Sequence, residues 1–344
     1  MIRVAVVGVG SMGHNHVLRY SDLPEVELVA IVEPRAERAA QYARQFSCHA
    51  FVSIDDLFTS SVELDAVSIV TPTAYHSRIA TSFLERGVHC LVEKPLADSS
   101  EKAQKLVDLA EQNGLVLLPG HVERFNPAVR AIRDKLSSIE YIKSYRVGPM
   151  SFRSIDTDVV MDLMTHDLDL VLHLCETDDV SIDVTRAVIG PKKLNDIANV
   201  HLRVGKSCFA DLTASRFAIA KRRKMRIFCR NDYFSIDCTK GRAMRMNRGR
   251  FQLGIPQLKI YQELGREPSP DEVFRHLGAE ILVSPGNGQY DALEAELRFF
   301  IECIHGKFDR SLLTANDGVR VIKLAEKIQK NLRDRGETKT LDSA

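Results

Sequence analysis

The chain has 344 residues, of which 44% are hydrophobic and 27% charged, and its formal net charge is +1. This composition excludes a disordered chain and provides no overall attraction to nucleic acid or to an anionic membrane. Seven cysteines without a C-x-x-C spacing argue against a disulfide framework and a metal site, and the lack of a membrane-length apolar run or signal peptide predicts a cytoplasmic protein.

The first predicted element is a buried parallel strand, Val4–Val7, because this apolar run is β-branched and too short for a buried helix. It leads into a G-x-G-x-x-G sequence, Gly8–Gly13, that opens a helical pattern. Gly8 is expected to allow a tight turn, Gly10 to let a pyrophosphate approach the backbone, and Gly13 to let the helix pack closely on the strand. The helix N-terminus would then hold the phosphate charge, so the stretch predicts a dinucleotide site.

A second predicted strand, Glu27–Val32, ends at the acidic Glu33. An acid at this place accepts hydrogen bonds from the adenosine ribose hydroxyls of a dinucleotide. Its carboxylate favours NAD because it would repel a 2′-phosphate, whereas Arg35 could accept that phosphate. We predict NAD, with NADP not excluded.

Helical and strand-like patterns alternate up to Leu118, which predicts a dinucleotide-binding domain with a doubly wound parallel sheet over residues 1–120. In such a sheet the ligand lies beyond the carboxyl ends of the strands. Lys94 of the Glu93-Lys94-Pro95 loop would therefore face the nicotinamide, unless it is a surface lysine in a turn. The helices are expected at Arg35–Gln45, Asp55–Ser60, His76–Glu85 and Ser100–Gln112, and the strands at Ala66–Val70, His89–Val92 and Leu115–Leu118.

Beyond Gly120, consecutive strands with short turns predict an α+β domain over residues 121–344 with a large, mostly antiparallel open sheet. Arg248–Gly288 is expected to be a loop, either a lid or a subunit contact, with a short helix capped by Ser269 and Glu272. The strands are expected at Tyr141–Val147, Val180–Ile189, Ala198–Val204, Cys208–Ser215, Met225–Cys229 and Tyr233–Cys238, and the helices at Ala128–Leu136, Met161–Leu174, Ala292–Ile304 and Gly318–Leu332.

Two patterns in this second part carry charge. Asp162 and His166 are four residues apart in a predicted helix and would share one face, as in a general base oriented by a carboxylate or in a surface ion pair. The basic run Lys221–Lys224 is interpreted first as a solvated loop, with binding of a phosphorylated substrate or of nucleic acid as alternatives.

Taken in order, these motifs resemble the Gfo/Idh/MocA family of oxidoreductases over nearly the whole chain. The resemblance implies a Rossmann domain followed by an open-sheet domain that forms a homodimer or homotetramer. It also implies catalysis by Lys94, Asp162 and His166, and cofactor binding by Gly8, Gly10, Ser11, Met12, Gly13, Glu33, Thr71, Pro72, His76, Glu93 and Lys94. The matching pieces are GVGSMG at Gly8–Gly13, TPTAYH at Thr71–His76, EKP at Glu93–Pro95, DLMTH at Asp162–His166 and ALEAELRFF at Ala292–Phe300.

The implied reaction is the NAD-dependent oxidation of a secondary hydroxyl on a sugar or cyclitol ring. His166 would take the hydroxyl proton, Lys94 would stabilise the developing alkoxide and assist proton transfer, and Asp162 would orient and charge-balance both. Which of Lys94 and His166 is the principal base stays open.

Gly120–Val129 and Thr213–Arg216 are similar to the branch of UDP-N-acetylglucosamine 3-dehydrogenases. This similarity implies a nucleotide sugar as the small-molecule partner, a 3-keto product for later transamination, and substrate binding by Arg124, Asn126 and Arg216. One alternative is an inositol or free-sugar dehydrogenase of the same family. Another is a non-catalytic dinucleotide-binding sensor, against which the intact lysine, aspartate and histidine argue.

Overall fold

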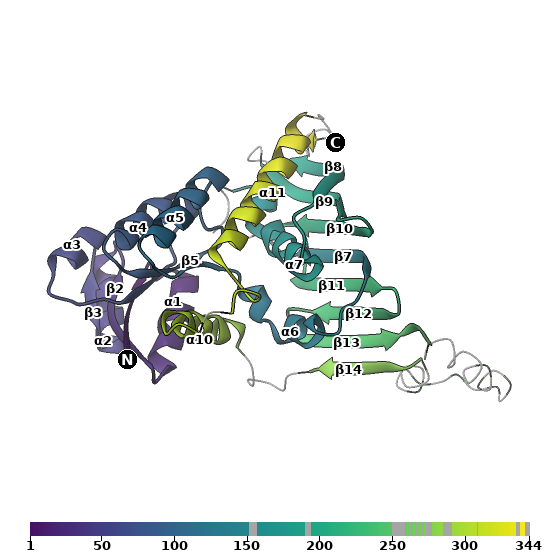
Figure 1. Cartoon of the computed structure of the whole chain (residues 1–344), viewed down its shortest axis with the longest axis horizontal. Coiled ribbons are helices and arrows are strands. Elements are labelled where there is room, and N and C mark those ends of the chain that lie inside the picture. The colour runs from purple at the N-terminus through teal and green to yellow at the C-terminus, as the bar shows by residue number, and fades with distance from the viewer. Residues whose placement is uncertain are drawn as a thin grey trace. The chain divides into compact units, whose positions relative to one another are not determined.

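The computed structural model of the chain divides into two compact units (Figure 1). The first comprises Met1–Phe125 and Asp291–Glu326, and the second comprises Asn126–Tyr290 and Lys327–Ala344. The predicted division into 1–120 and 121–344 differs in two respects, because the first unit extends to Phe125 and Asp291–Glu326 packs with it. The residues described are 1–150, 157–189, 194–249, 259, 261, 263, 265, 267, 269, 272, 277–284, 291–307, 309–334 and 338–340.

A parallel sheet forms the centre of the first unit, with the order β3-β2-β1-β4-β5-β6 among the described residues. This order changes direction between β1 and β4, where doubly wound sheets bind their ligands. The parallel doubly wound sheet is thereby confirmed, although the short β3 has no apolar run and was not predicted. The strands are β1 Ile2–Val7, β2 Val26–Val32, β3 His49–Phe51, β4 Ala66–Ile69, β5 His89–Glu93 and β6 Leu117–Gly120.

The helices of this unit alternate with its strands, as predicted. For α5 the observed bounds are the predicted ones, because Ser99 accepts a hydrogen bond from the Lys102 N–H and begins the helix. The short 3₁₀ helix η1 ends the first segment of the unit. The bounds are α1 Ser11–Asp22, α2 Ala36–Phe46, α3 Ile54–Thr59, α4 Thr73–Leu84, α5 Ser100–Gln112 and η1 Val122–Phe125.

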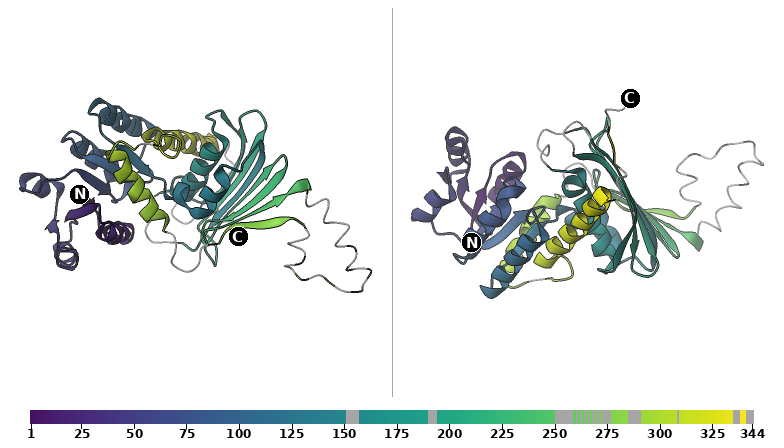
Figure 2. Two further views of the ribbon diagram at one scale, coloured as in Figure 1. Left: turned by 60° about the horizontal axis from the view of Figure 1, so that its bottom comes forward. Right: turned by 90° about the horizontal axis from the view of Figure 1, so that it is seen from above.

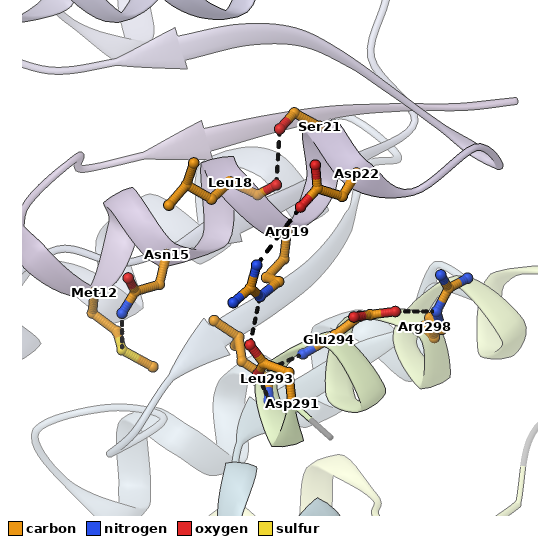
Figure 3. Close-up of polar contacts among 10 residues, drawn as sticks. All are labelled: Met12, Asn15, Leu18, Arg19, Ser21, Asp22, Asp291, Leu293, Glu294 and Arg298. Carbon is orange, nitrogen blue, oxygen red and sulfur yellow. Dashed lines mark hydrogen bonds and ion pairs between the residues drawn. The ribbon is translucent and has the colours of Figure 1, made fainter. Parts of the chain in front are cut away.

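Helix α10, Ala292–Ile304, belongs to the first unit although it lies far along the chain. Figure 3 shows how it is joined to α1: Arg19 donates to the Asp291 carboxylate at 2.5 Å. The same carboxylate caps α10 by accepting two backbone N–H groups at 2.8 and 3.3 Å. Leu297 and Phe300 are fully buried in the core that also holds residues of α1. The apolar face of α10 and the ion pair between Arg19 and Asp291 thus pack this segment into the first unit.

The second unit contains a large sheet with the order β14-β13-β12-β11-β7-β10-β9-β8-β15 among the described residues. Neighbours pair antiparallel except β10 with β7 and β15 with β8, which confirms the predicted, mostly antiparallel sheet. The strands are β7 Ile139–Val147, β8 Val180–Ile189, β9 Asn195–Val204, β10 Cys208–Ser215, β11 Arg222–Cys229, β12 Asp232–Asp237, β13 Arg242–Asn247, β14 Ala279–Val283 and β15 Thr338–Thr340.

Helices cover one face of this sheet (Figure 2). Along β11, Met225 and Ile227 are buried whereas Arg226 and Phe228 are exposed, so successive side chains alternate between a covered and an exposed face. None of the helices within the described ranges is long and apolar enough to cross a membrane. The helices are α6 Pro127–Arg133, the π-helix η2 Val160–Met164, α7 Thr165–Cys175 and α11 Ala315–Asp334, which runs across the boundary between the two units.

Two predictions about this unit were wrong. The basic run is not a loop, because β11 begins at Arg222 and carries the run on a strand. Within the predicted loop 248–288, residues Ala279–Val283 form β14 and pair with the polar strand β13, whose sequence has no apolar alternation. The capping of Ser269 and Glu272 is confirmed by reciprocal hydrogen bonds of 2.8 and 3.3 Å. Most of the remaining range lies outside the described residues.

His89, the first residue of β5, is expected to make the first unit sensitive to acid. Its Nδ1 accepts a hydrogen bond from the Val116 N–H at 2.9 Å. Burial lowers the pKa of His89 below its usual value of 6.5 and outweighs the opposite effect of Asp65. Just below pH 6.5 the unfolded chain therefore binds more protons than the folded chain. The contribution of neutral His89 to the free energy of unfolding is fully present above pH 6.5 and is lost as the pH falls through the lowered pKa of the folded state.

Urea unfolding at pH 7.5 and 5.5 measures this effect. We expect the midpoint to fall with acidification more in the native chain than in a His89→Gln variant, whose amide oxygen accepts the same hydrogen bond without titrating. Equal falls in both proteins would show that His89 does not contribute.

Candidate active site

The glycine-rich loop after β1 forms an open cradle. Gly8 has φ +88°, and a Cβ there would lie 2.7 Å from the Val70 carbonyl oxygen. A Cβ on Gly13 would lie 1.8 Å from the Gly8 oxygen, so α1 packs directly on the turn. At Gly10 a Cβ would meet nothing within 4 Å. Since Gly10 caps α1 without a side chain, the first N–H groups of this helix meet no side-chain cap.

Glu33 lies at the edge of this cradle and is 4% exposed. Its Oε2 accepts from the Val9 N–H at 3.3 Å, and its Oε1 accepts from Arg35 Nε at 2.6 Å. Burial by itself would raise the pKa of Glu33, but the hydrogen bonds from Arg35 and Val9 outweigh it and hold this pKa below its usual value. Glu33 is therefore a carboxylate fixed beside the glycine loop, and Arg35 is paired with it.

The loop after β4 adds an unused hydroxyl and a buried histidine. Thr71 Oγ1 is buried and has no hydrogen-bond partner among the described residues. The ring of His76 lies between two carbonyl oxygens, with Nε2 2.7 Å from that of Thr71 and Nδ1 2.8 Å from that of Pro95. Burial lowers the pKa of His76. Pro72 is the N-cap residue of α4.

Lys94 directly follows β5 and is partly exposed. Its backbone N–H donates to Glu93 Oε2 at 3.1 Å, and Glu93 Oε1 lies 3.2 Å from His16 Nε2. Burial alone would raise the pKa of Glu93, but the hydrogen bond and charge of His16, with the charge of Lys94, lower it. The sequence interpretation missed His16; its place on the helix after the glycine loop is the only sequence signal.

In the second unit, Asp162 and His166 lie where η2 meets α7. The predicted helix begins with a π-helical turn, in which the Thr165 N–H bonds to the Val160 carbonyl. The change from π-helical to α-helical hydrogen bonding thus falls between Asp162 and His166. Asp162 Oδ2 accepts from Arg216 Nη2 at 3.1 Å.

Arg216, a predicted substrate-binding residue, is buried among acidic partners. It is 6% exposed, lies 3.4 Å from Asp196 and donates to the Thr157 carbonyl. Two carboxylates, those of Asp162 and Asp196, thus share one guanidinium. Arg216 therefore holds Asp162, and its contact with a substrate stays a prediction.

Arg124 and Asn126, the other two predicted substrate-binding residues, also have structural partners. Arg124 is 2% exposed, donates to the Leu312 carbonyl at 2.8 Å and lies 3.1 Å from Asp317. Asn126 caps α6 by accepting from the Ala128 N–H at 3.1 Å, and its amide donates to the Cys238 carbonyl at 2.9 Å. These contacts arise from residues far apart in the chain, which the short motif around both residues does not reveal.

The first unit has the groups that a dinucleotide needs. The open backbone at Gly10 and the N-terminus of α1 would hold a pyrophosphate, and Glu33 would accept from ribose hydroxyls. The unpartnered Thr71 hydroxyl and Lys94 follow the neighbouring strands β4 and β5, which end at the same edge of the sheet as β1. No group of three or more metal-binding side chains is arranged to hold an ion within the described part of the chain.

Comparisons with known proteins agree with this assignment. Residues 2–121 match the oxidoreductase family with an NAD-binding Rossmann fold, and residues 149–244 match the GFO/IDH/MocA C-terminal domain. A curated UDP-N-acetylglucosamine 3-dehydrogenase of Acidithiobacillus ferrooxidans is 36% identical over 260 residues, which are 75% of this chain and 81% of that protein. The scyllo-inositol 2-dehydrogenase (NADP(+)) IolU of Bacillus subtilis is 28% identical over 45% of this chain and 47% of that protein.

Solved structures extend the similarity to nearly the whole chain. The structure of UDP-N-acetylglucosamine 3-dehydrogenase GnnA from Acidithiobacillus ferrooxidans has a TM-score of 0.80 and 31% identity, covering 97% of this chain and 98% of that one. KijD10, a 3-ketoreductase from Actinomadura kijaniata solved with TDP-benzene and NADP, shares the fold with a TM-score of 0.77 at 17% identity, covering 98% of both chains. On these matches and the geometry of its two units, the chain belongs to the Gfo/Idh/MocA family of oxidoreductases.

Proposed function

We propose that the protein is an NAD-dependent dehydrogenase that oxidises the 3-hydroxyl of UDP-N-acetylglucosamine. The extent of one similarity carries this proposal: the UDP-N-acetylglucosamine 3-dehydrogenase matches over 75% of this chain, whereas the inositol dehydrogenase IolU matches over 45% at lower identity. The product would be a 3-keto sugar, whose carbonyl is a substrate for transamination.

For catalysis we propose Lys94, Asp162 and His166. Bound NAD supplies a hydride acceptor. His166 would take the proton of the substrate hydroxyl, and the Lys94 ammonium would stabilise the negative charge that develops on the oxygen. Asp162, which Arg216 holds at 3.1 Å, would orient and charge-balance these groups.

The environment of Glu33 supports NAD as the cofactor. Its pKa lies below the usual value, so the side chain is a carboxylate at neutral pH and would repel a 2′-phosphate. Arg35, which could have accepted that phosphate, donates to Glu33 at 2.6 Å. The basic partner is therefore already engaged with the acid.

The exposed face of the second unit's sheet supports the proposed homo-oligomer. Across β10, β7 and β11, Phe209, Tyr141 and Phe228 lie opposite one another in register. Phe209 and Phe228 are 46% and 39% exposed, as is Tyr145 at 43%. Aromatic side chains gathered on an exposed sheet are typical of protein interfaces.

The direct test is NAD reduction, followed as absorbance of the reduced cofactor, with UDP-N-acetylglucosamine, N-acetylglucosamine and myo-inositol as substrates and NADP in parallel. We expect turnover only with the nucleotide sugar, and faster turnover with NAD. Turnover with a free sugar or inositol alone would assign the protein to that alternative. Binding of NAD without turnover of any substrate would favour the non-catalytic sensor.

A further inference from the structure

We propose that His16 and His76 are positioning residues that hold the backbone of Lys94 from its two sides. The inference rests on the proposed function, because it concerns the placement of the proposed catalytic lysine. Both histidines are buried, at 0% and 1% exposure, and they come from different helices, α1 and α4. All the contacts that carry the inference lie within the first unit.

On the N-terminal side of Lys94, His16 acts through Glu93. One carboxylate oxygen of Glu93 lies 3.2 Å from His16 Nε2, and the other accepts from the Lys94 N–H at 3.1 Å. The neighbouring strand confines this carboxylate, since a Cβ on Gly120 would lie 3.0 Å from Glu93 Cα and 3.1 Å from its carboxyl group. The hydrogen bond from His16 therefore sets the direction of the bond that Glu93 makes to Lys94.

On the C-terminal side, His76 acts through Pro95. Its ring nitrogens lie 2.8 and 2.7 Å from the carbonyl oxygens of Pro95 and Thr71, so the ring fills the space between the loops that follow β5 and β4 and donates its one N–H there. The next residue, Leu96, is 1% exposed and packs against Gly318 so closely that a Cβ there would lie 3.1 Å from it. The chain after Lys94 is thus as confined as the chain before it.

The result is a segment in which one side chain reaches the surface. Glu93, Pro95, Leu96 and Ala97 are all buried, whereas Lys94 is partly exposed. Burying two histidines and a carboxylate carries a desolvation cost. The arrangement offsets this cost by fixing the backbone position from which the Lys94 side chain extends. Small displacements of a catalytic group can lower a rate by about 10²-fold, so the frame matters to the rate more than to cofactor affinity.

The test compares variants that keep or remove the hydrogen bonds. His76→Phe and His16→Phe remove the ring nitrogens, whereas His76→Gln and His16→Gln keep a side-chain N–H donor. His89→Phe is the matched control, because His89 is a partly buried histidine at the other end of the same strand, β5. For each protein, kcat, KM, the Kd for NAD and the urea midpoint are measured.

We expect the phenylalanine variants at 16 and 76 to lose at least about tenfold in kcat, and the glutamine variants to recover part of the loss. In His16→Phe, which changes a residue with no predicted contact to the cofactor, the Kd for NAD should change less than about threefold. The His89→Phe control should lose stability and keep its kcat. A kcat that stays at the native value, or that falls only in proportion to stability as in the control, would overturn the inference.

A second readout does not depend on turnover. Reductive methylation with ¹³C-formaldehyde labels the lysines, and the Lys94 resonance is assigned by its loss in Lys94→Arg. We expect His76→Phe to shift and broaden this resonance and His89→Phe to leave it unchanged. An unmoved Lys94 resonance would overturn the inference even if no substrate were turned over, whereas a moved resonance without turnover would contradict only the proposed function.

Discussion

Replacing His166 with asparagine is expected to lower kcat on the nucleotide sugar by about 10²- to 10⁴-fold, the contribution of a positioned general acid or base. The Kd for NAD should change little, because the glycine loop and Glu33 belong to the first unit and His166 to the second. The rate is measured by absorbance of the reduced cofactor, and the Kd by calorimetry. His201→Asn is the control, since His201 is an exposed histidine on the sheet of the same unit.

Lys94→Met is expected to cause a loss of similar size, because it removes the charge that stabilises the alkoxide and keeps the length of the side chain. If the two residues act on one proton transfer, the double variant should lose little more than either single variant. Native activity in either single variant would contradict the catalytic assignment. Losses that multiply in the double variant would show that the two residues act on separate steps.

Replacing Gly13 with alanine should have the second large effect, on folding as well as on binding. The new Cβ would lie 1.8 Å from the Gly8 oxygen, closer than any real contact. Neither atom can rotate away, because the Cβ is fixed by the backbone of residue 13 and the oxygen belongs to the backbone of Gly8. The start of α1 must shift, at a cost of about 3 kcal/mol or more in the free energy of unfolding. We expect a lower urea midpoint and loss of NAD binding.

Gly10→Ala is the matched substitution with the opposite expectation. Its Cβ would meet nothing within 4 Å, and Gly10 has φ −61°, which alanine adopts readily. The free energy of unfolding should stay within about 0.5 kcal/mol of the native value. Because the methyl group enters the space through which a pyrophosphate approaches, the Kd for NAD should rise at least about tenfold. Native affinity in this variant would show that the phosphates do not approach the backbone at Gly10.

Regular elements with local signals were predicted closely. The bounds of α5, α10, β8 and β10 agree with the prediction at both ends. Their apolar periodicity and, for the helices, the capping residues Ser99 and Asp291 lie within the segments themselves. The sequence did not predict the strands β3, β13 and β14, because they are short or polar. They are stabilised by hydrogen bonds to a neighbouring strand.

The candidate site also combines features that a continuous motif predicted with features that only the folded chain shows. The glycine loop is one continuous motif: Gly8 has the positive φ and Gly13 the close contact that their positions predict, and Gly10 borders open space. The substrate-binding roles of Arg124, Asn126 and Arg216 stay predictions from short motifs, but the sequence did not reveal that Arg124 pairs with Asp317 and Arg216 with Asp162 and Asp196. A buried arginine and an exposed one look alike in a sequence, because burial depends on what folds against them.

The sequence by itself determined the alternating order of the first unit, the phosphate cradle and the family, because these follow from neighbours in the chain. Only the tertiary structure decided that α10 returns to the first unit, that the predicted helix around Asp162 begins as a π-helix, and that His16 and His76 frame Lys94. The physical reason is that these features depend on which buried charges and carbonyl groups find partners. Those partners come from segments that only folding brings together.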